Sequence, residues 1–442
     1  MARYKPQDHN SLLLPVVLSE QIIPGSFAFA LNYLVDHELD LKPLDAQFKN
    51  DDVGASAYDP RVMLKIVLLA YSQGLISSRV IEQACARNVQ FIAISGDSQP
   101  SHTHIAKFVS SLSDQIKPLF SQVLMTCDAQ GLIGRDMFAI DGVKLPSSAS
   151  KELKSNVTDP QSAKLATSKG VMQGYAAQAA VDSAHQVIIA ADVIGSGSEQ
   201  AMLMPMIAQA SPYRTPQTLV TADAGYHSDA NIAQLQQQGI PAMVADNQMR
   251  YRDERFAEQD KYKGKPDPLS EKKATGQDAE VKRFRPKDFR FHDDNTATCP
   301  AGQVMVSPGT IYTTARGLNY QTYTAKAVDC NACALSAQCL RGPMKPNDGR
   351  GRQVTRFEPK VVDNANPSER MRQAIDSPKG RHLYSQRFGT VEPVFANLRH
   401  NKRLTRLNHR GRAKVNTQWN LYCMVHNIEK LAKTALGQQI VQ

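Results

Sequence analysis

The sequence lacks several features that define membrane and secreted proteins. Its best apolar run, VMLKIVLLA, is interrupted by Lys65, so no stretch approaches the ~18 apolar residues of a membrane-spanning helix. The first residues, MARYKPQDHNSLLLPVVL, have neither the apolar core nor the small-residue cleavage site of a signal peptide. Seven cysteines, an odd number, are a poor disulfide framework for 442 residues. We therefore expect a soluble protein in the reducing cytoplasm.

Acidic residues are also scarce. The chain has 52 Lys and Arg against 42 Asp and Glu, a net charge of +10. Such an excess favours a polyanionic partner, of which nucleic acid is the commonest for a soluble chain, although a basic protein without such a partner is an alternative. The deficit is greatest between Ser377 and Ile428, where Glu392 is the only acid. An isolated carboxylate in so basic a segment needs a local partner or a chemical role.

The residue pattern changes along the chain from helical to strand-like and back, which predicts an α/β protein whose core is interrupted by an insertion. Residues 59–130 are typical of helices, with Asp59 as N-cap, Pro60 in the first position and one helix over residues 77–96. From residue 136, short β-branched runs give the order strand, strand, strand, helix, strand, helix. We predict an N-terminal arm (1–55), a helical domain (56–130), the first part of the core (131–245), a β-rich insertion (246–366) and the second part with C-terminal helices (367–442).

The predicted helical domain is a candidate DNA-binding region. Its basic residues are suited to binding DNA phosphates, but an ordinary helical bundle with a solvated face explains them equally well. These residues are Arg61, Lys65, Arg79, Arg87 and Lys107.

Two aspartates follow strand-like runs and are candidate metal ligands. Asp141 follows MFAI and Asp223 follows TLVTA, and ligands of α/β proteins bind at the carboxyl ends of strands. Two such aspartates with a third acid from a helix could hold two Mg²⁺ ions for phosphoryl transfer. A strand-end Asp followed by Gly is also common in turns, and Asp182 is a competitor of that kind.

Glu392 is the candidate third acid. Val391, Val394, Phe395 and Leu398 form an apolar stripe at helical spacing, which can pack on the sheet while Glu392 beside it reaches the strand ends. The alternative is a simple ion pair with Arg387 or Arg399.

Together, AIDGV, TADAGYHS and YSQRFGTVEPVFANLRHNKR resemble the DDE transposases of bacterial insertion sequences, in the branch with an insertion before the catalytic glutamate. The block from Asp59 to Phe108 resembles the N-terminal helical domain of that group, and the resemblance covers roughly residues 50 to 430. It implies an RNase H-like mixed-sheet core in which Asp141, Asp223 and Glu392 are catalytic and bind Mg²⁺ or Mn²⁺. It also implies double-stranded DNA as the partner, a homo-oligomer on DNA, and a place at the bacterial nucleoid.

The family signature around the glutamate is Tyr, two residues, Arg, three residues, Glu, six residues, Lys. Tyr384 and Arg387 fit it, but four residues separate Arg387 from Glu392, and Arg399 replaces the lysine. The extra residue turns Arg387 by about 100° relative to Glu392 in a continuous helix. Pro393 predicts that the helix is kinked there or begins near Thr390.

Basic residues surrounding Glu392 are the expected DNA contacts, through phosphates and largely without sequence preference. With Tyr384 and Arg387 they are Arg399, Lys402, Arg403, Arg406, Arg410, Arg412 and Lys414.

Four cysteines fall inside the predicted insertion: Cys299, Cys330, Cys333 and Cys339. The spacing of CNAC is that of a zinc hairpin, and four thiolates would hold together a small β-subdomain with little core. Free thiols are the alternative.

Two other functions of the whole protein also stay open, a nuclease of the same core that does not join strands and an inactive DNA-binding regulator.

Overall fold

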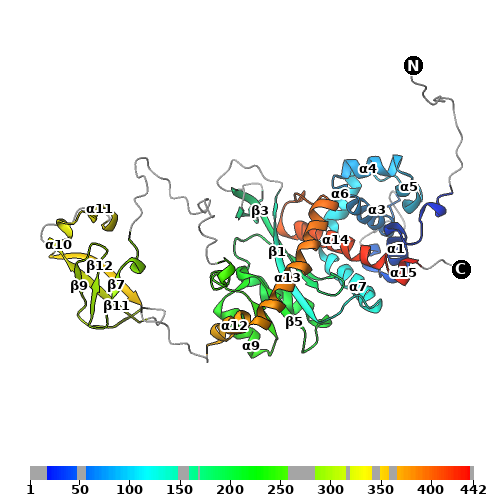
Figure 1. Cartoon of the computed structure of the whole chain (residues 1–442). Coiled ribbons are helices and arrows are strands. Elements are labelled where there is room, and N and C mark those ends of the chain that lie inside the picture. Colours follow the sequence, from blue (N-terminus) through cyan, green and yellow to red (C-terminus); the bar gives the residue numbers. More distant parts are fainter. Residues whose placement is uncertain are drawn as a thin grey trace, which may run out of the picture. The chain divides into compact units, whose positions relative to one another are not determined.

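The computed structural model describes residues 17–46, 56–147, 159–167, 170–256, 284–314, 319–340, 349–357 and 366–438. It is a mixed α/β protein with two sheets. The chain forms two compact units: unit 1 comprises Met1–Leu269 and Arg370–Gln442, and unit 2 comprises Ser270–Glu369 (Figure 1). No helix in the described ranges is long and apolar enough to span a membrane.

The N-terminal part of unit 1 is helical. Asp59 caps the central helix of this region by accepting a hydrogen bond from the Arg61 backbone N–H at 2.7 Å, which confirms the predicted start at Pro60. The helix predicted over residues 77–96 is wrong, because Asn88 takes an extended conformation and its side chain caps a second helix. The elements are η1 (Ser19–Gln21), α1 (Phe27–Tyr33), η2 (Leu34–Glu38), α2 (Lys42–Asp45), α3 (Pro60–Ser72), α4 (Ser78–Arg87), α5 (Val89–Ser95), α6 (His102–Ser111), η3 (Leu112–Asp114) and α7 (Ile116–Ala129).

The sheet of unit 1 mixes antiparallel and parallel strands. Its strands are β1 (Met137–Pro146), β2 (Ala163–Thr167), β3 (Gly170–Asp182), β4 (Ile188–Ile194), β5 (Leu219–Ala222) and β6 (Ala242–Val244). The order is β2-β3-β1-β5-β6, with β4 also paired to β3. β1 runs antiparallel to β3 and parallel to β5, and β6 is parallel to β5. The predicted order of four strands and two helices is confirmed, with β2 and β6 in addition.

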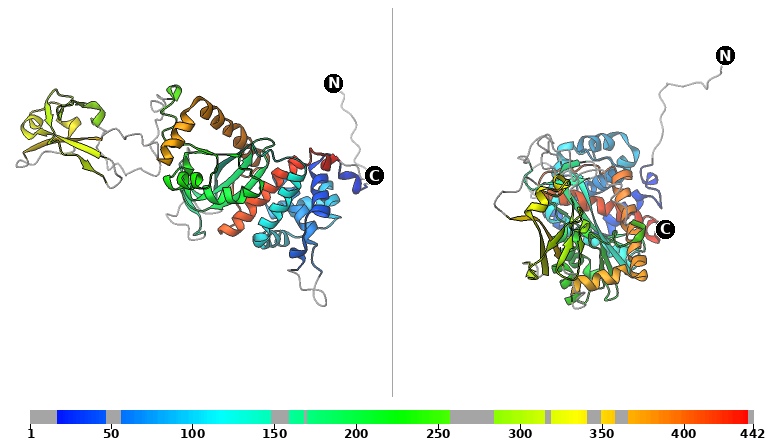
Figure 2. Two further views of the ribbon diagram at one scale, coloured as in Figure 1. Left: turned by 90° about the horizontal axis from the view of Figure 1, so that it is seen from below. Right: turned by 60° about the vertical axis from the view of Figure 1, so that its left-hand side comes forward.

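The remaining elements of unit 1 are helices that follow β4 along the chain. They are η4 (Gln200–Met202), α8 (Leu203–Ala210), η5 (Ser211–Tyr213), η6 (Ala224–Tyr226), α9 (Asp229–Gln237), η7 (Glu254–Phe256), α12 (Pro367–Asp376), α13 (Pro378–Ala396), η10 (Asn397–Asn401), α14 (Arg412–Leu431) and α15 (Ala435–Gln438). Figure 2 gives two further views of the fold, and α13 contacts β1, β3 and β5 of this sheet.

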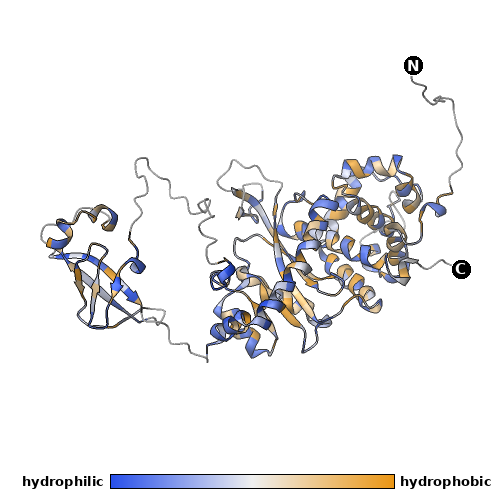
Figure 3. Ribbon diagram, viewed as in Figure 1, coloured by the Kyte–Doolittle hydropathy of each residue, from blue (hydrophilic) through white to orange (hydrophobic). Residues whose placement is uncertain are grey.

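One helix, α14, holds the core of unit 1 together. Fourteen of its 20 residues are buried, and it contacts α3, α7 and β4. The buried Asn427 side chain bonds both the N–H (2.9 Å) and the carbonyl (2.9 Å) of Ile188 on β4, and Tyr422 stacks on Tyr71 of α3 at 4.6 Å. The N-terminal helices and the sheet therefore share one hydrophobic core, and Figure 3 shows hydrophobic colour along the helices around α14.

α13 runs continuously through Pro393, so the expectation that it begins near Thr390 is wrong. A proline inside a helix removes one N–H donor and leaves the carbonyl four residues earlier without its partner. That carbonyl belongs to Gly389, and the Gln186 side chain donates a hydrogen bond to it at 3.0 Å. A long-range contact thus replaces the local bond that Pro393 removes.

Unit 2 is a small β-rich subdomain. Its elements are η9 (Pro286–Asp288), β7 (Arg290–Phe291), β8 (Thr296–Thr298), β9 (Val304–Val306), β10 (Tyr312–Thr313), β11 (Asn319–Lys326), α10 (Ala327–Asn331), α11 (Ser336–Cys339) and β12 (Arg350–Phe357). The strand order is β10-β11-β9-β8-β7, with β12 paired to β11. Its described core has six buried residues: Phe289, Ala297, Met305, Tyr323, Ala325 and Val354.

Candidate active site

Asp141 and Asp223 lie side by side on neighbouring parallel strands. The last register pair of β1 with β5 is Ile140 with Ala222, and each aspartate is the next residue along the chain, Asp141 within β1 and Asp223 directly after β5. β1 does not end at Asp141, as the sequence pattern suggested, but continues to Pro146 by pairing with β3. The two carboxylates are therefore brought together because β5 stops where β1 continues.

Asp141 is paired with a buried arginine from α13. The Nη2 atom of Arg387 lies 2.7 Å from Oδ2 of Asp141, and the side chains are only 4% and 20% exposed. The Asp141 Oδ1 atom accepts a hydrogen bond from the N–H of Gly142 at 2.8 Å. The sequence pattern predicts that Arg387 contacts DNA, whereas in the structure its side chain reaches from α13 to the carboxylate of Asp141.

The pKa of Asp141 is raised to about 6. Burial is the largest cause, and the carboxylates of Asp223 and Glu199 raise the pKa further, while Arg387 and the Gly142 N–H lower it. Three acids at this edge of the sheet thus repel one another, and one cation offsets part of that repulsion.

Glu199 is the acid that sequence analysis missed. It follows β4, and because β3 is antiparallel to both β1 and β4, the carboxyl end of β4 lies at the same edge as that of β1. Its Oε1 atom accepts a hydrogen bond from Nε2 of Gln178 at 3.2 Å, and burial raises its pKa. The strand-end rule that selected Asp141 and Asp223 would have found Glu199, had it been extended across the loop after Ile194.

Gln178 on β3 orients the Glu199 carboxylate through a hydrogen bond. Its side chain is fully buried on β3, opposite Gly142, and its Oε1 accepts a hydrogen bond from the Tyr226 hydroxyl. Tyr226 is also fully buried, and its pKa lies well above the usual value, first because of burial and then because of the nearby Glu199 carboxylate. A neutral hydroxyl can only donate to Gln178 here, which fixes the amide so that its N–H₂ faces Glu199.

Two glycines make room for the Glu199 carboxylate. A Cβ at Gly142 would lie 2.6 Å from Glu199 Oε1, and a Cβ at Gly225 would lie 2.9 Å from Oε2. Both distances are closer than real Cβ contacts. The glycines in AIDGV and ADAGY therefore serve the approach of a side chain rather than a positive φ.

Asp182, the competing aspartate, is a turn residue. Its two carboxylate oxygens accept hydrogen bonds from four backbone N–H groups, those of Gly134, Arg135, Ala184 and His185, at 2.9–3.3 Å. Its acceptor capacity is taken up by the backbone at the opposite end of β1.

Glu392 lies exposed on α13. It is five residues after Arg387, which in a continuous helix corresponds to about 140° around the axis, so it does not share the sheet-facing side of Arg387. The apolar stripe of Val391, Val394 and Leu398 is buried as predicted. Glu392 forms no ion pair with another described residue, and Arg387 is bound to Asp141 instead, so the ion-pair alternative fails.

A broad cavity of about 1280 Å³ opens beside the acids. Asp141, Glu199 and Asp223 line it together with basic residues, among them Lys144, Arg399 and Arg406. Arg406 also donates a hydrogen bond from Nε to the carbonyl of Ser147 at 3.3 Å. Acidic and basic side chains therefore border one cavity, as a site for a phosphodiester with bound cations requires.

The other predicted DNA contacts divide by exposure. Arg403, Arg410, Arg412 and Lys414 are exposed, with Arg412 near Asp192 at 3.7 Å. Lys402 is buried and paired with Glu429, and Tyr384 is buried, which raises its pKa. In the helical region Lys65 is buried against Asp36 and is not available to DNA.

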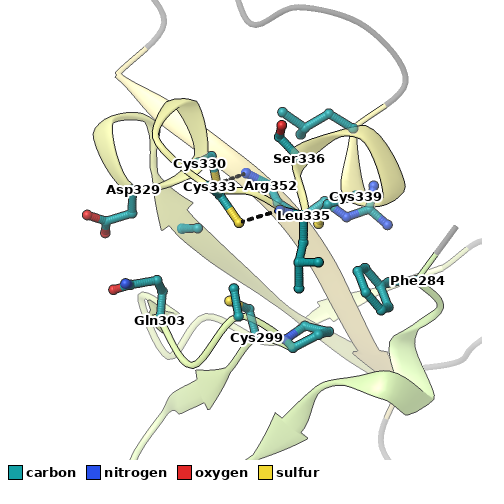
Figure 4. Close-up of a pocket in the computed structure, with 14 residues that line it drawn as sticks. Phe284, Cys299, Gln303, Asp329, Cys330, Cys333, Leu335, Ser336, Cys339 and Arg352 are labelled. Atoms are coloured by element: carbon teal, nitrogen blue, oxygen red, sulfur yellow. Dashed lines mark hydrogen bonds between the residues drawn. The ribbon is translucent and has the colours of Figure 1, made fainter.

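The four cysteines of unit 2 line one small cavity of about 30 Å³ (Figure 4). All four are free thiols, as are Cys85, Cys127 and Cys423, which are buried in unit 1. Among the described residues, no three His, Cys, Asp or Glu side chains form a ready-made metal-binding group, in unit 1 or in unit 2. At the acids of unit 1, Arg387 occupies one side of Asp141.

Comparison with known proteins gives two family matches. Residues 298–432 match a family described as "Transposase DDE domain", and residues 16–111 match one described as "Transposase domain (DUF772)". The first range contains Arg387, Glu392 and the four cysteines, whereas Asp141 and Asp223 lie between the two ranges. No curated protein matches the chain.

Proposed function

Because the chain belongs to the DDE transposases of insertion sequences, we propose that it cleaves the DNA ends of its element and joins them to target DNA by metal-assisted phosphoryl transfer. The observation that carries this proposal is the adjacency of Asp141 and Asp223 at the edge of a cavity that is also lined by three basic side chains, Lys144, Arg399 and Arg406. The antiparallel strands β4, β3 and β1, continued by the parallel β5 and β6, support an RNase H-like core.

The carboxylates fit a divalent cation. Asp141 and Asp223 offer the hard oxygen donors that Mg²⁺ and Mn²⁺ prefer. Burial is the largest cause of the raised pKa of Asp141, and a cation would offset the smaller contribution from the Asp223 and Glu199 carboxylates. When bound, such ions would supply activation of the attacking oxygen and stabilisation of the leaving oxygen. Glu392 is our proposed third ligand, and its exposure on α13 implies a side-chain or helix adjustment when the site is loaded.

The chain's own residues do the positioning. Gln178 and Tyr226 hold the Glu199 carboxylate toward Gly142 and Gly225. Arg387 neutralises Asp141, and on metal binding its guanidinium would be released from that task and become available to a phosphate.

Exposed basic residues around the cavity would hold the DNA backbone. Arg399 and Arg406 line the cavity itself, and Arg403, Arg410, Arg412 and Lys414 extend the basic surface beyond it. Such contacts bind any DNA sequence and weaken with salt. We further propose a homo-oligomer on paired ends in the bacterial cytoplasm, testable by light scattering with and without end DNA.

The decisive test compares Asp141→Asn and Asp223→Asn on a labelled DNA carrying the element's end. We expect both variants to lose cleavage by more than about 1,000-fold while DNA binding stays within about 3-fold, because only the charged form can hold the ions. Asp97→Asn is the matched control: Asp97 has a φ of 60°, which Asn tolerates, and it lies in a loop of the helical region.

The products of the wild-type protein separate the alternatives. Joined strands identify a transposase, whereas cleavage without joining would leave only the nuclease. Binding without either reaction would leave a DNA-binding regulator and refute the proposal.

A further inference from the structure

Three separate segments of unit 2 bring four thiols to one place. Cys299 follows β8, Cys330 lies in α10, Cys333 follows that helix, and Cys339 is the last residue of α11. Figure 4 shows Cys299, Cys330, Cys333 and Cys339 around one cavity, with Phe284 and Leu335 as apolar walls. At about 30 Å³, the cavity has room for a single ion rather than for an organic ligand.

Two sulfurs already accept backbone hydrogen bonds. The N–H of Leu335 donates to Sγ of Cys333 at 3.4 Å, and the N–H of Arg352 donates to Sγ of Cys330 at 3.4 Å. Peptide N–H groups directed at sulfur stabilise thiolate charge, so they favour the form of cysteine that binds metals.

A cation also borders the thiols. Arg352 lines the same cavity, and its buried Nε has no hydrogen-bond partner among the described residues. Four thiolates around a Zn²⁺ ion carry a net charge of about −2, which the Arg352 guanidinium would partly offset. Burial raises the pKa of the Cys339 thiol and Arg352 lowers it. Cys330, Cys299 and Cys333 raise this pKa further, so the four thiols are close enough to interact electrostatically.

Unit 2 has little else to hold its helices. α10 and α11 contain five and four residues and bury none of them. Isolated helices of this length are unstable, and a core of six buried residues is small for a subdomain. Gly351 lets β12 approach α10 closely, since a Cβ there would lie 2.7 Å from Sγ of Cys330.

We infer that Cys299, Cys330, Cys333 and Cys339 bind one structural Zn²⁺ ion that joins α10 and α11 to the turn after β8. On binding, the four S–H groups release their protons to solvent and four Zn–S bonds form, drawing the sulfurs to about 2.3 Å from the metal. Soft thiolate ligands select zinc over the hard ions proposed for unit 1. The inference does not depend on the proposed function.

The test is the metal content of the full chain, purified without chelator and measured by mass spectrometry of the elements. We expect about one zinc per chain, and after exchange with Co²⁺ the absorption spectrum of a tetrahedral thiolate site. Cys330→Ser should lower zinc affinity by more than the 10–100-fold that changes outside the ligand set cause.

Asp329→Asn is the matched control, because Asp329 neighbours Cys330 and lines the same cavity without being a thiol. It should keep the zinc of the wild type. Less than about half a zinc per chain in the wild type would overturn the inference. So would iron in place of zinc, or an equal loss in Asp329→Asn and Cys330→Ser. Because the wild-type stoichiometry is read directly, a cysteine variant that fails to fold leaves the test intact.

Discussion

The two units differ in the size of the hydrophobic core that stabilises them. In unit 1 a single hydrophobic cluster runs through the N-terminal helices, the sheet and α14, whereas the described core of unit 2 has six residues. α14 buries 14 of its 20 residues, but α10 and α11 bury none. Figure 3 reflects this contrast, with more hydrophilic colour along the strands of unit 2.

The difference teaches where a cross-link is needed. A large domain buries enough apolar surface to offset the loss of chain entropy, while a small one requires a metal or a disulfide. Free cysteines follow the same division: those of unit 1 are buried singly in the core, and those of unit 2 gather around one cavity.

The strongest way to break this comparison is to open the core of unit 1 at Trp419. This side chain is fully buried, stacks on Phe395 at 6.5 Å and donates from Nε1 to the carbonyl of Gln178 at 2.9 Å. Trp419→Ala should lower the free energy of unfolding of unit 1 by about 3–5 kcal/mol, measured by urea denaturation.

The zinc content of unit 2 should not change in Trp419→Ala, since its core is separate. Trp419→Phe is the control, which keeps most of the ring contact and loses less stability. If zinc were lost at the same urea concentration at which unit 1 unfolds, the two units would not be independent.

A second prediction distinguishes the carboxylates within unit 1. Glu392→Gln should reduce cleavage by about 100-fold or more at every Mg²⁺ concentration, because a ligand is removed. Glu199→Gln should cost about 10-fold and be rescued by raised Mg²⁺, because Glu199 shapes the charge around Asp141 and Asp223.

The reverse pattern would identify Glu199 as the third ligand and leave Glu392 as a surface acid. Metal titrations of cleavage rate for both variants decide between these assignments. Neither change should alter the zinc content of unit 2, which keeps the two metal environments distinct.

The smallest expected effect concerns pH. The pKa of Asp141 is about 6, above its usual value, and Arg387 lowers it. Metal binding needs the ionised carboxylate, so activity is expected to fall as the pH drops through the pKa of Asp141. Removing the cation in Arg387→Gln raises that pKa, and the acid limb of the pH–rate profile should move upward by up to about one unit. Arg387→Lys should leave the limb nearly unchanged, and a downward shift in Arg387→Gln would contradict the assignment.

Local rules predicted the four strands β1, β3, β4 and β5, the start of α3 and two of the three clustered acids. Asp141 and Asp223 follow apolar β-branched runs, and Asp59 precedes Pro60, so each carries its own signal. β6 has only three residues, too few for a pattern, and was missed.

What escaped prediction depends on contacts between distant segments. The pairing of Arg387 with Asp141 joins α13 to β1, and the Gln186 side chain supports the helix at Pro393. Proline does remove a hydrogen bond from the helix, as predicted, but the sequence could not show that the Gln186 side chain would replace it at the Gly389 carbonyl. Glu199 was hidden because a loop, rather than a strand end, carries it to the sheet edge.

The position of α14 in the chain also orders the events of synthesis. α3, α7 and β4 pack against this helix, yet it is translated after all of them and after the whole of unit 2. The apolar faces of α3 and α7 therefore stay uncovered by α14 through most of translation. The contacts of α14 with these helices have a long sequence separation, and such contacts slow folding. A ribosome that stops before Arg412 releases a chain in which Asp141, Asp223 and Glu392 are all present but the core beneath them is not closed.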